Sequence, residues 1–172
     1  MQRVLVIGSP GAGKSTLAHA IAQRTGLPLH HLDRMHWLPG WIERDRAEAL
    51  ERVKAVLVEE RWIIDGNYGS TLPVRIPRAD TVVWLDYPTH LCLWRVLKRW
   101  WQYRGTARPD MTEGCPENLN AEFLLYVLMF RHNWSARNGA AMAAFSGTLL
   151  RFTHPRQTQA WLDRLGTAEG AA

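Results

Sequence analysis

The sequence predicts an α/β fold in which helices cover both faces of a parallel sheet. Short apolar, β-branched runs alternate with segments of helical spacing along the chain. A glycine-rich loop separates the first of these runs from the first helix. Three later runs end in an aspartate, and the carboxyl ends of parallel strands meet at one edge of a sheet. We therefore expect a ligand crevice at that edge.

The first strand and the first helix lie on either side of the glycine-rich loop. Residues 3–7 form an apolar run that is expected to be buried on both faces of the sheet. Residues 15–25 carry apolar side chains at helical spacing, and Gly26 ends this helix. A second strand is expected at 29–32, with Asp33 at its end.

The later elements continue the alternation of strands and helices. Further strands are expected at 62–64, 81–85 and 148–152. Further helices are expected at 45–60, 89–103, 121–145 and 155–165. Pro155 suits the first turn of the last helix, and the small residues of 166–172 are expected to fray.

Length and composition indicate one globular domain spanning residues 1–172. Hydrophobic residues make up 47% of the chain and charged residues 22%, which excludes a disordered or collagen-like sequence. Two cysteines, Cys92 and Cys115, do not make a disulfide framework. The first apolar run is too short for a signal peptide, and no run reaches the roughly eighteen apolar residues of a membrane span. We expect a cytoplasmic protein without a membrane partner.

The net charge of +5 is concentrated in one segment. Residues 75–108 hold seven bases and two acids, so the rest of the chain is balanced. Two kinds of partner fit this surplus: the phosphates of a small nucleotide, or a nucleic-acid backbone.

The glycine-rich loop has the GxxxxGK[ST] pattern of a phosphate-binding loop. It follows a strand and begins a helix, which is the context that supports the pattern. Inward-pointing amide groups and the helix N-terminus would hold phosphate oxygens, Lys14 would neutralise the β- and γ-phosphates, and the Ser15 hydroxyl would bind Mg²⁺. The residues expected to bind ATP here are Gly8, Ser9, Pro10, Gly11, Ala12, Gly13, Lys14, Ser15 and Thr16.

Two aspartates at strand ends are candidates for roles in the same crevice. Asp65 follows an apolar strand and precedes a glycine, so we expect it to provide the second acidic contact for Mg²⁺. Asp33 could accept the proton of an acceptor hydroxyl or hold the acceptor in line. A turn-capping role is the alternative for both. Asp86 is expected to initiate the turn before the next helix.

Three histidines, His30, His31 and His36, do not have the spacing of a metal site. We expect one of them to pack in the interior and the others to lie near the crevice.

Several of these strings together resemble the P-loop proteins named DNA topology modulation proteins, which are similar to adenylate and shikimate kinases. They are the phosphate loop, the Asp33–Trp37 segment followed by Trp41, Trp62–Tyr68, the 79–88 strand, and Thr112–Glu117. The resemblance implies a P-loop, nucleoside monophosphate kinase-like fold with a five-stranded parallel sheet in the order 2-3-1-4-5, a mobile lid and ATP binding. The lid would span about 104–120.

The resemblance also assigns residues and shows one departure. Asp65 matches the aspartate that precedes Gly-Phe-Pro-Arg in adenylate kinases, but Asn67-Tyr68-Gly69 replaces Phe-Pro-Arg here. The nucleotide-acceptor arginine is thus missing from its place, and Arg75 or Arg78 could substitute.

Arginines of the basic segment are expected to close over the transferred phosphoryl group. Arg104 and Arg108 flank a hinge-like glycine in the lid, and we assign both to catalysis and Arg104 also to ATP binding. Arg95 and Arg99 share a helix face that could equally be solvated. Arg131 and Arg137 could also point back into the site, and Glu113 and Glu117 could pair with these arginines.

Two further groups of residues have competing interpretations. His154 and Arg156 match the region that borders the adenine ring, so one of them could stack on the base; a helix cap is the alternative. Trp94, Trp100 and Trp101 lie among basic residues, as in single-strand nucleic-acid binding, but packing of their helix explains most of this pattern.

The leading hypothesis is a magnesium- and ATP-dependent kinase that phosphorylates a small acceptor beyond Asp33 and Asp65. One alternative is a nucleic-acid-binding protein whose nucleotide site acts as a switch. Another is an ATP-binding protein of little turnover that acts through a partner. The sequence is compatible with a monomer or a homodimer.

Overall fold

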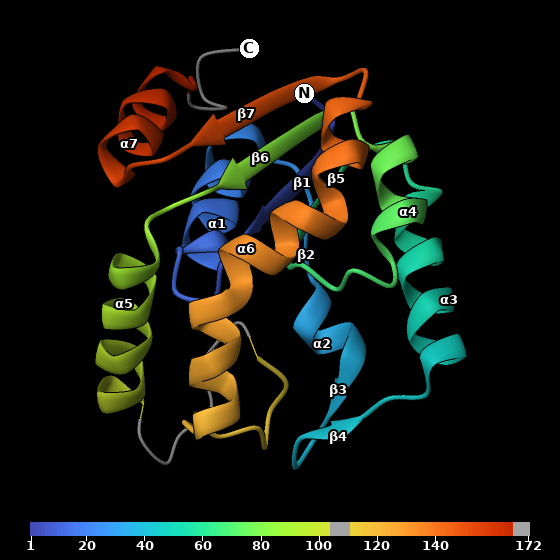
Figure 1. Cartoon of the computed structure of the whole chain (residues 1–172). Coiled ribbons are helices and arrows are strands. Elements are labelled where there is room, and N and C mark those ends of the chain that lie inside the picture. Colours follow the sequence, from blue (N-terminus) through green and yellow to red (C-terminus); the bar gives the residue numbers. More distant parts are fainter. Residues whose placement is uncertain (104–110, 167–172) are drawn as a thin grey trace.

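A five-stranded parallel sheet forms the centre of the protein (Figure 1). The structure, a computed structural model, describes residues 1–103 and 111–166, with the backbone alone at 135–137. The strands are β1 (Arg3–Gly8), β2 (Leu29–His31), β5 (Trp62–Asp65), β6 (Thr81–Leu85) and β7 (Thr148–Phe152). They pair in parallel in the order β2-β5-β1-β6-β7. Counted within this sheet alone the order is 2-3-1-4-5, which confirms the predicted fold class.

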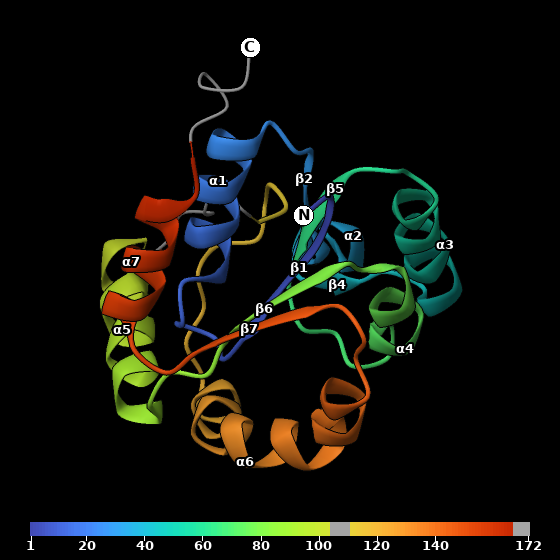
Figure 2. The same ribbon diagram turned by 90° about the horizontal axis from the view of Figure 1, so that it is seen from above.

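Helices cover the sheet on both faces (Figure 2). The long helices are α1 (Lys14–Thr25), α3 (Arg46–Leu57), α5 (Thr89–Gln102), α6 (Ala121–Ala143) and α7 (Pro155–Arg164). Alternate residues of β1 enter opposite cores: Val4 packs with α1, α5 and α7, whereas Leu5 packs with α3 and α6. All five of the predicted long helices are present, and Asp45 caps α3 as Asn120 caps α6.

Short elements between β2 and α3 and between β5 and β6 differ from the prediction. They are α2 (Leu32–His36), β3 (Trp37–Leu38), β4 (Ile42–Glu43), α4 (Leu72–Arg75) and the 3₁₀ helix η1 (Ile76–Arg78). The strands β3 and β4 form an antiparallel hairpin. Because the edge strand β2 ends at His31, Asp33 lies in the first turn of α2 and not at a strand end.

The parallel register brings the strand ends together. Val6 pairs with Asp65, Asp65 pairs with His31, and Gly8 pairs with Leu85. The loop after β1 therefore begins between the end of β5 and the end of β6, which is the switch point where crevices open in such sheets.

Asp86, directly after β6, is an anchor for two arginines. Its buried carboxylate accepts hydrogen bonds from Arg131 Nε of α6 at 2.9 Å and Arg151 Nε of β7 at 3.0 Å. The Arg151 guanidinium also lies over the Trp84 ring, 4.5 Å from its centroid. Asp86 thus joins α6 and β7 to the sheet, whereas Pro88 is the N-cap of α5. The expectation that Arg131 points back toward a phosphate is not met, because it pairs with Asp86.

Replacing Asp86 with Ala is expected to lower the free energy of unfolding by about 1–3 kcal/mol, because the hydrogen bonds to both guanidinium groups are lost. Both arginines are half-exposed and can be hydrated, which limits the cost. Urea unfolding of the two proteins measures the difference. The exposed Glu51, paired with Lys54 within α3, provides the control: Glu51→Ala should change stability by about 0.5 kcal/mol or less. Equal effects of the two substitutions would contradict the role of Asp86.

Candidate functional site

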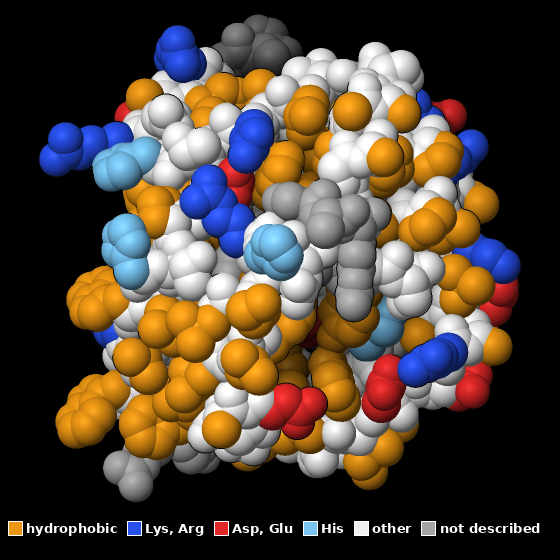
Figure 3. Space-filling view, in the orientation of Figure 1, with side chains coloured by type: hydrophobic (Ala, Val, Ile, Leu, Met, Phe, Trp, Pro, Cys, Tyr) orange, Lys and Arg blue, Asp and Glu red, His pale blue; other side chains and the backbone are white. Residues whose placement is uncertain are grey.

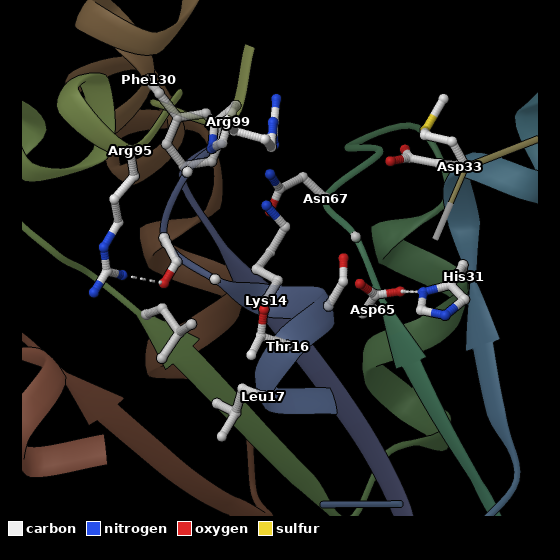
Figure 4. Close-up of a pocket in the computed structure, with 18 of the residues that line it drawn as sticks. Lys14, Thr16, Leu17, His31, Asp33, Asp65, Asn67, Arg95, Arg99 and Phe130 are labelled. Carbon is white, nitrogen blue, oxygen red and sulfur yellow. Dashed lines mark hydrogen bonds and ion pairs between the residues drawn. The ribbon is translucent and has the colours of Figure 1, made fainter. Parts of the chain in front are cut away.

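A cleft of about 2110 Å³ opens at the carboxyl edge of the sheet. Figure 4 shows side chains from several elements directed into it. Most of the residues that the sequence singled out line this cleft together: Pro10, Gly11, Ala12, Gly13, Lys14, Ser15, Thr16, Asp33, Asp65, Arg95 and Arg99. The structure therefore brings the loop after β1 and the two aspartates to one place.

The backbone of the loop requires glycine at two positions. Gly11 has φ of 79°, and a Cβ there would lie 2.3 Å from the carbonyl oxygen of Cys92 in α5. Gly13 is the N-cap of α1 with φ of 92°. The left-handed conformation at these positions turns the chain from strand to helix, and the close approach to α5 holds the loop against the sheet.

Gly11→Ala is expected to destabilise the protein by about 1–3 kcal/mol, because the new methyl group overlaps Cys92 and the backbone conformation is strained. Thermal or urea unfolding checks this value. Gly69→Ala is the matched control, since nothing lies within 4 Å of its Cβ position; its effect should stay within about 0.5 kcal/mol. A Gly11→Ala protein as stable as the Gly69→Ala protein would show that the loop is not held as described.

Several amide groups of the loop have no acceptor in the part of the chain that the structure describes. The Ala12 N–H donates to the Ser9 carbonyl at 3.0 Å, but the N–H groups of Gly11, Gly13, Lys14 and Ser15 make no hydrogen bond there. These groups include the first turn of α1, where the helix dipole adds positive potential. Such a set of donors fits the oxygens of a phosphate chain.

Lys14 adds the charge of an ammonium group to the same loop. Its Nζ donates to the Ser9 carbonyl at 3.2 Å. Burial lowers the pKa of Lys14, and the carboxylates of Asp33 and Asp65 oppose this shift. An anion bound beside Nζ would offset the desolvation of the ammonium group, which makes the residue suited to a phosphate.

Asp65 is buried at the end of β5, and its Oδ1 is 2.6 Å from His31 Nδ1 (Figure 4). His31 therefore lies at the crevice edge, as expected for one of the three histidines. Asp65 and Ser15 both line the cleft and could hold a metal ion that arrives with phosphates. Among the described residues no cluster of three or more His, Cys, Asp or Glu side chains could bind a metal ion.

Asp33 is held by Tyr68 from the loop after β5. The Tyr68 hydroxyl donates to Asp33 Oδ1 at 3.0 Å, and its ring stacks on His36 with centroids 3.6 Å apart. Burial and the neighbouring Asp33 carboxylate raise the pKa of Tyr68, so the hydroxyl stays protonated as a donor. Burial lowers the pKa of His36, whose Nδ1 hydrogen bonds to the Leu32 carbonyl. His36 is thus the packed histidine of the three.

Asn67 is a residue that the sequence reasoning missed. Its Nδ2 donates to the Gly8 carbonyl at 2.7 Å, and its Oδ1 accepts from the Gly8 N–H at 3.1 Å. These two bonds tie the loop after β5 to the start of the loop after β1. The available signal was the Asp-Gly-Asn-Tyr string, but its partner lies 59 residues away.

The arginines of the basic segment that the structure describes make hydrogen bonds or ion pairs with other parts of the protein. Arg95 donates to the Ala12 carbonyl at 3.2 Å, and Arg99 pairs with the buried Glu117 at 2.7 Å. Arg75 is fully buried under the loop after β5, and Arg78 donates to the Leu57 carbonyl. Neither Arg75 nor Arg78 lines the cleft, so neither replaces the missing nucleotide-acceptor arginine.

Three arginines of the sequence hypothesis cannot be placed. Arg104 and Arg108 lie outside the described residues, and at Arg137 the description is limited to the backbone. Glu117, which was expected to pair with Arg131 or Arg137, pairs with Arg99.

His154 and Arg156 do not line the cleft. His154 is the N-cap of α7, where its side chain accepts from the Arg156 N–H in a capping box with Gln157. The helix-cap alternative therefore describes His154. From the same part of the chain, Pro155, Thr158, Gln159 and Leu162 do line the cleft.

The β3–β4 hairpin and the 111–117 segment form a wall that the sequence did not reveal. Gly40 N–H donates to the Gly114 carbonyl at 3.0 Å, and the Trp41 indole donates to the Pro116 carbonyl at 2.9 Å. Cys115 is buried, and its Sγ donates to the Leu38 carbonyl at 3.3 Å. Cys115 is thus a structural member of this segment, as expected.

Several tryptophans are not in the core. Trp94 and Trp101 are exposed on α5 together with Leu97, and hydrophobic side chains gather over this helix in Figure 3. Trp62 is fully buried, and Trp84 packs against Trp134. The expectation that packing accounts for the tryptophans of α5 is wrong for Trp94 and Trp101.

Comparisons with known proteins agree with the fold. Residues 4–64 match the family described as "ATPase family associated with various cellular activities (AAA)", a match that runs from β1 to β5. No curated protein matches the sequence at a significant level.

Similar solved structures include a gluconokinase from Sinorhizobium meliloti 1021 and a candidate kinase from Chloroflexus aurantiacus J-10-fl. The gluconokinase has a TM-score of 0.55 and 18% identity, over 96% of this chain and 93% of that chain. The Chloroflexus protein has a TM-score of 0.55 and 17% identity, over 95% and 97%. A sugar kinase from Janibacter sp. HTCC2649 has a TM-score of 0.48 and 20% identity, over 100% and 98%. The two structures at 0.55 show that this chain has a P-loop kinase-like fold. In the described ranges, 1–103 and 111–166, no helix is long and apolar enough to span a membrane.

Proposed function

We propose that the protein is an ATP-dependent phosphotransferase that moves the γ-phosphoryl group to a small hydroxyl-bearing acceptor. The observation that carries the proposal is a set of amides, at Gly11, Gly13, Lys14 and Ser15, that find no acceptor among the described residues and lie beside a desolvated ammonium group. A crevice with these donors and two carboxylates opposite them suits phosphoryl transfer, in which positioning and charge neutralisation provide most of the catalysis.

The nucleotide half of the cleft is the loop from Gly8 to Thr16. Its amides and Lys14 would hold the β- and γ-phosphates, and Ser15 and Asp65 would hold Mg²⁺. The metal ion would supply neutralisation of phosphate charge. His31, through its bond to Asp65 Oδ1, orients the carboxylate. Pro155, Thr158 and Leu162 lie where the base could pack, in place of His154 and Arg156.

The acceptor half contains Asp33, Tyr68 and the wall formed by the hairpin and the 111–117 segment. Asp33 would take the proton of the acceptor hydroxyl as that oxygen bonds to the γ-phosphorus and the bond to the β–γ bridging oxygen breaks, which releases ADP. Donation from Tyr68 to Oδ1 fixes the orientation of the carboxylate.

The negative charge of the transferred group is proposed to be neutralised by Arg95, Arg99, Arg104 and Arg108. Residues 104–120 are proposed to act as a lid, and residues 1–172 to form a single domain. The kinase names of the structural neighbours support phosphotransfer in general. The names of these neighbours and the resemblance to DNA topology modulation proteins do not identify the acceptor. The protein is proposed to act in the cytoplasm.

The function is tested by a screen of nucleosides, nucleotides, sugars and other small hydroxyl metabolites for ADP release above the rate without acceptor. We expect one chemical class to stimulate turnover and to yield a phosphorylated product detectable by mass spectrometry. If the protein binds Mg-ATP but no class stimulates turnover, a binding or regulatory role would replace the kinase role. A DNA effect requires a salt-dependent affinity for DNA, which a titration at two salt concentrations measures.

A further inference from the structure

Arg75 is a buried charge for which the reaction described above has no use. The side chain belongs to α4 and is fully buried. Among the described residues no carboxylate forms an ion pair with it, although buried charges are ordinarily paired. Burial lowers the pKa of Arg75 to about 9. Burial of a guanidinium group without a carboxylate is unfavourable, so the hydrogen bonds that the group donates must account for its position.

The donors of Arg75 all reach the chain between β5 and α4. Nη1 donates to the Gly66 carbonyl at 3.3 Å, Nη2 donates to the carbonyls of Asn67 and Tyr68, and Nε donates to Thr71 Oγ1 at 3.1 Å. One planar guanidinium group therefore fixes three successive carbonyls of the loop after Asp65. A lysine ammonium cannot reproduce this planar set of donors.

The loop that Arg75 holds contacts both halves of the cleft. Asn67 makes two hydrogen bonds with Gly8 at the start of the phosphate loop, and Tyr68 donates to Asp33. Gly66 packs so closely on Leu32, the neighbour of Asp33, that a Cβ would lie 2.9 Å from the Leu32 Cβ. Tyr68 also has a positive φ of 25°, a conformation that persists only when surrounding contacts hold it.

We propose that Arg75 is a positioning residue for phosphoryl transfer: it fixes the Gly66–Tyr68 backbone so that Asn67 holds the phosphate loop and Tyr68 holds Asp33 at the same time. The proposal rests on the proposed function. Arg75 contacts neither nucleotide nor acceptor in this account; it sets the relative placement of the two groups that do. Misplacement by about 1 Å is enough to lower a transfer rate by about 100-fold.

Arg75→Lys is the test variant, and Arg78→Lys is the matched control because Arg78 is exposed and its Nε donates to a carbonyl outside the cleft. Two quantities are measured below the melting temperature of each protein: the Kd for Mg-ATP by calorimetry, and the rate of ADP release with water as the acceptor. For Arg75→Lys we expect a rate lower by about 10- to 100-fold and a Kd raised by less than about tenfold. Both quantities should change less than about twofold in Arg78→Lys.

Combining Arg75→Lys with substitutions in the loop separates a positioning role from a purely structural one. If Arg75 acts through its loop, Arg75→Lys should cost less than about threefold in rate when Asn67→Ala and Tyr68→Phe are already present. A full additional loss in that background would overturn the proposal. So would an unchanged rate and Kd in a folded Arg75→Lys protein.

Hydrogen exchange tests the role of Arg75 without an activity assay. Arg75→Lys should speed exchange of the Gly8 amide, which Asn67 holds, and leave the amides of β6 unchanged. If the unsubstituted protein fails to bind Mg-ATP, the proposed function is wrong. Unchanged Gly8 exchange in Arg75→Lys would separately reject the role of Arg75. If Arg75→Lys does not fold, Thr71→Val is the second variant, because it removes the acceptor of Arg75 Nε. We expect the same faster exchange of the Gly8 amide and a several-fold lower rate of ADP release. The absence of both effects would overturn the proposal.

Discussion

Lys14→Ala is expected to reduce ATP turnover by about 100- to 1,000-fold while the protein stays folded, because one preorganised cation for the β- and γ-phosphates is removed. Nζ is desolvated and donates a hydrogen bond to the Ser9 carbonyl, and Lys14 belongs to neither core, so its loss leaves the packing of the two cores intact. ADP release measured with a coupled assay gives the rate, and circular dichroism gives the fold.

Lys54→Ala is the matched control for this substitution. Lys54 is exposed on α3, where it pairs with Glu51, and it does not line the cleft. Its removal should leave the rate within about twofold of the original. Undiminished turnover in a folded Lys14→Ala protein would exclude Lys14 from the mechanism.

Asp33→Asn is expected to reduce acceptor-dependent transfer by about 100-fold or more, because an amide cannot take the proton of the acceptor hydroxyl. The amide oxygen can still accept from Tyr68, so the geometry of α2 is retained. The Kd for Mg-ATP should change less than about threefold, since the proposed function assigns Asp33 to the acceptor half of the cleft. Single-turnover transfer and a nucleotide titration measure the two effects separately.

Asp163→Asn provides the control for the loss of a negative charge. Asp163 lies on α7 and accepts a hydrogen bond from Gln159, and we expect no change in transfer. Equal losses of transfer and of Mg-ATP affinity in Asp33→Asn would contradict the base role and would favour a general structural role for the carboxylate.

The large elements of the fold could be predicted because their signals are local. Continuous apolar runs such as 3–7 and 81–85 are typical of strands buried on both faces of a parallel sheet, and the glycine pattern before Lys14 indicates the strand-to-helix turn. The parallel register then places Asp65 beside β1 without any further assumption.

The residues that were missed depend on contacts between distant parts of the chain. The hairpin of β3 and β4 has two residues in each strand, and Trp41 adopts a φ of 61° that its residue type does not suggest. The partners of this hairpin lie about 75 residues away in the 111–117 segment, as the Trp41–Pro116 bond shows.

Arg75 illustrates the same limit for charged residues. A basic segment indicates a solvent-facing or anion-binding surface when the sequence alone is considered. Only the tertiary structure reveals that one of its arginines is inside the protein and bound to carbonyl groups. Charge counts along a chain therefore overstate the charge that is available to a ligand.

The most direct test of the central claim is a calorimetric titration of the folded protein with Mg-ATP, repeated with Lys14→Ala. The loop between Gly8 and Thr16, with its free amides, predicts saturable binding at one site and an affinity weakened by about tenfold or more in the variant. No heat of binding in the unsubstituted protein, or the same affinity in both proteins, would contradict the assignment of this loop to a nucleotide triphosphate.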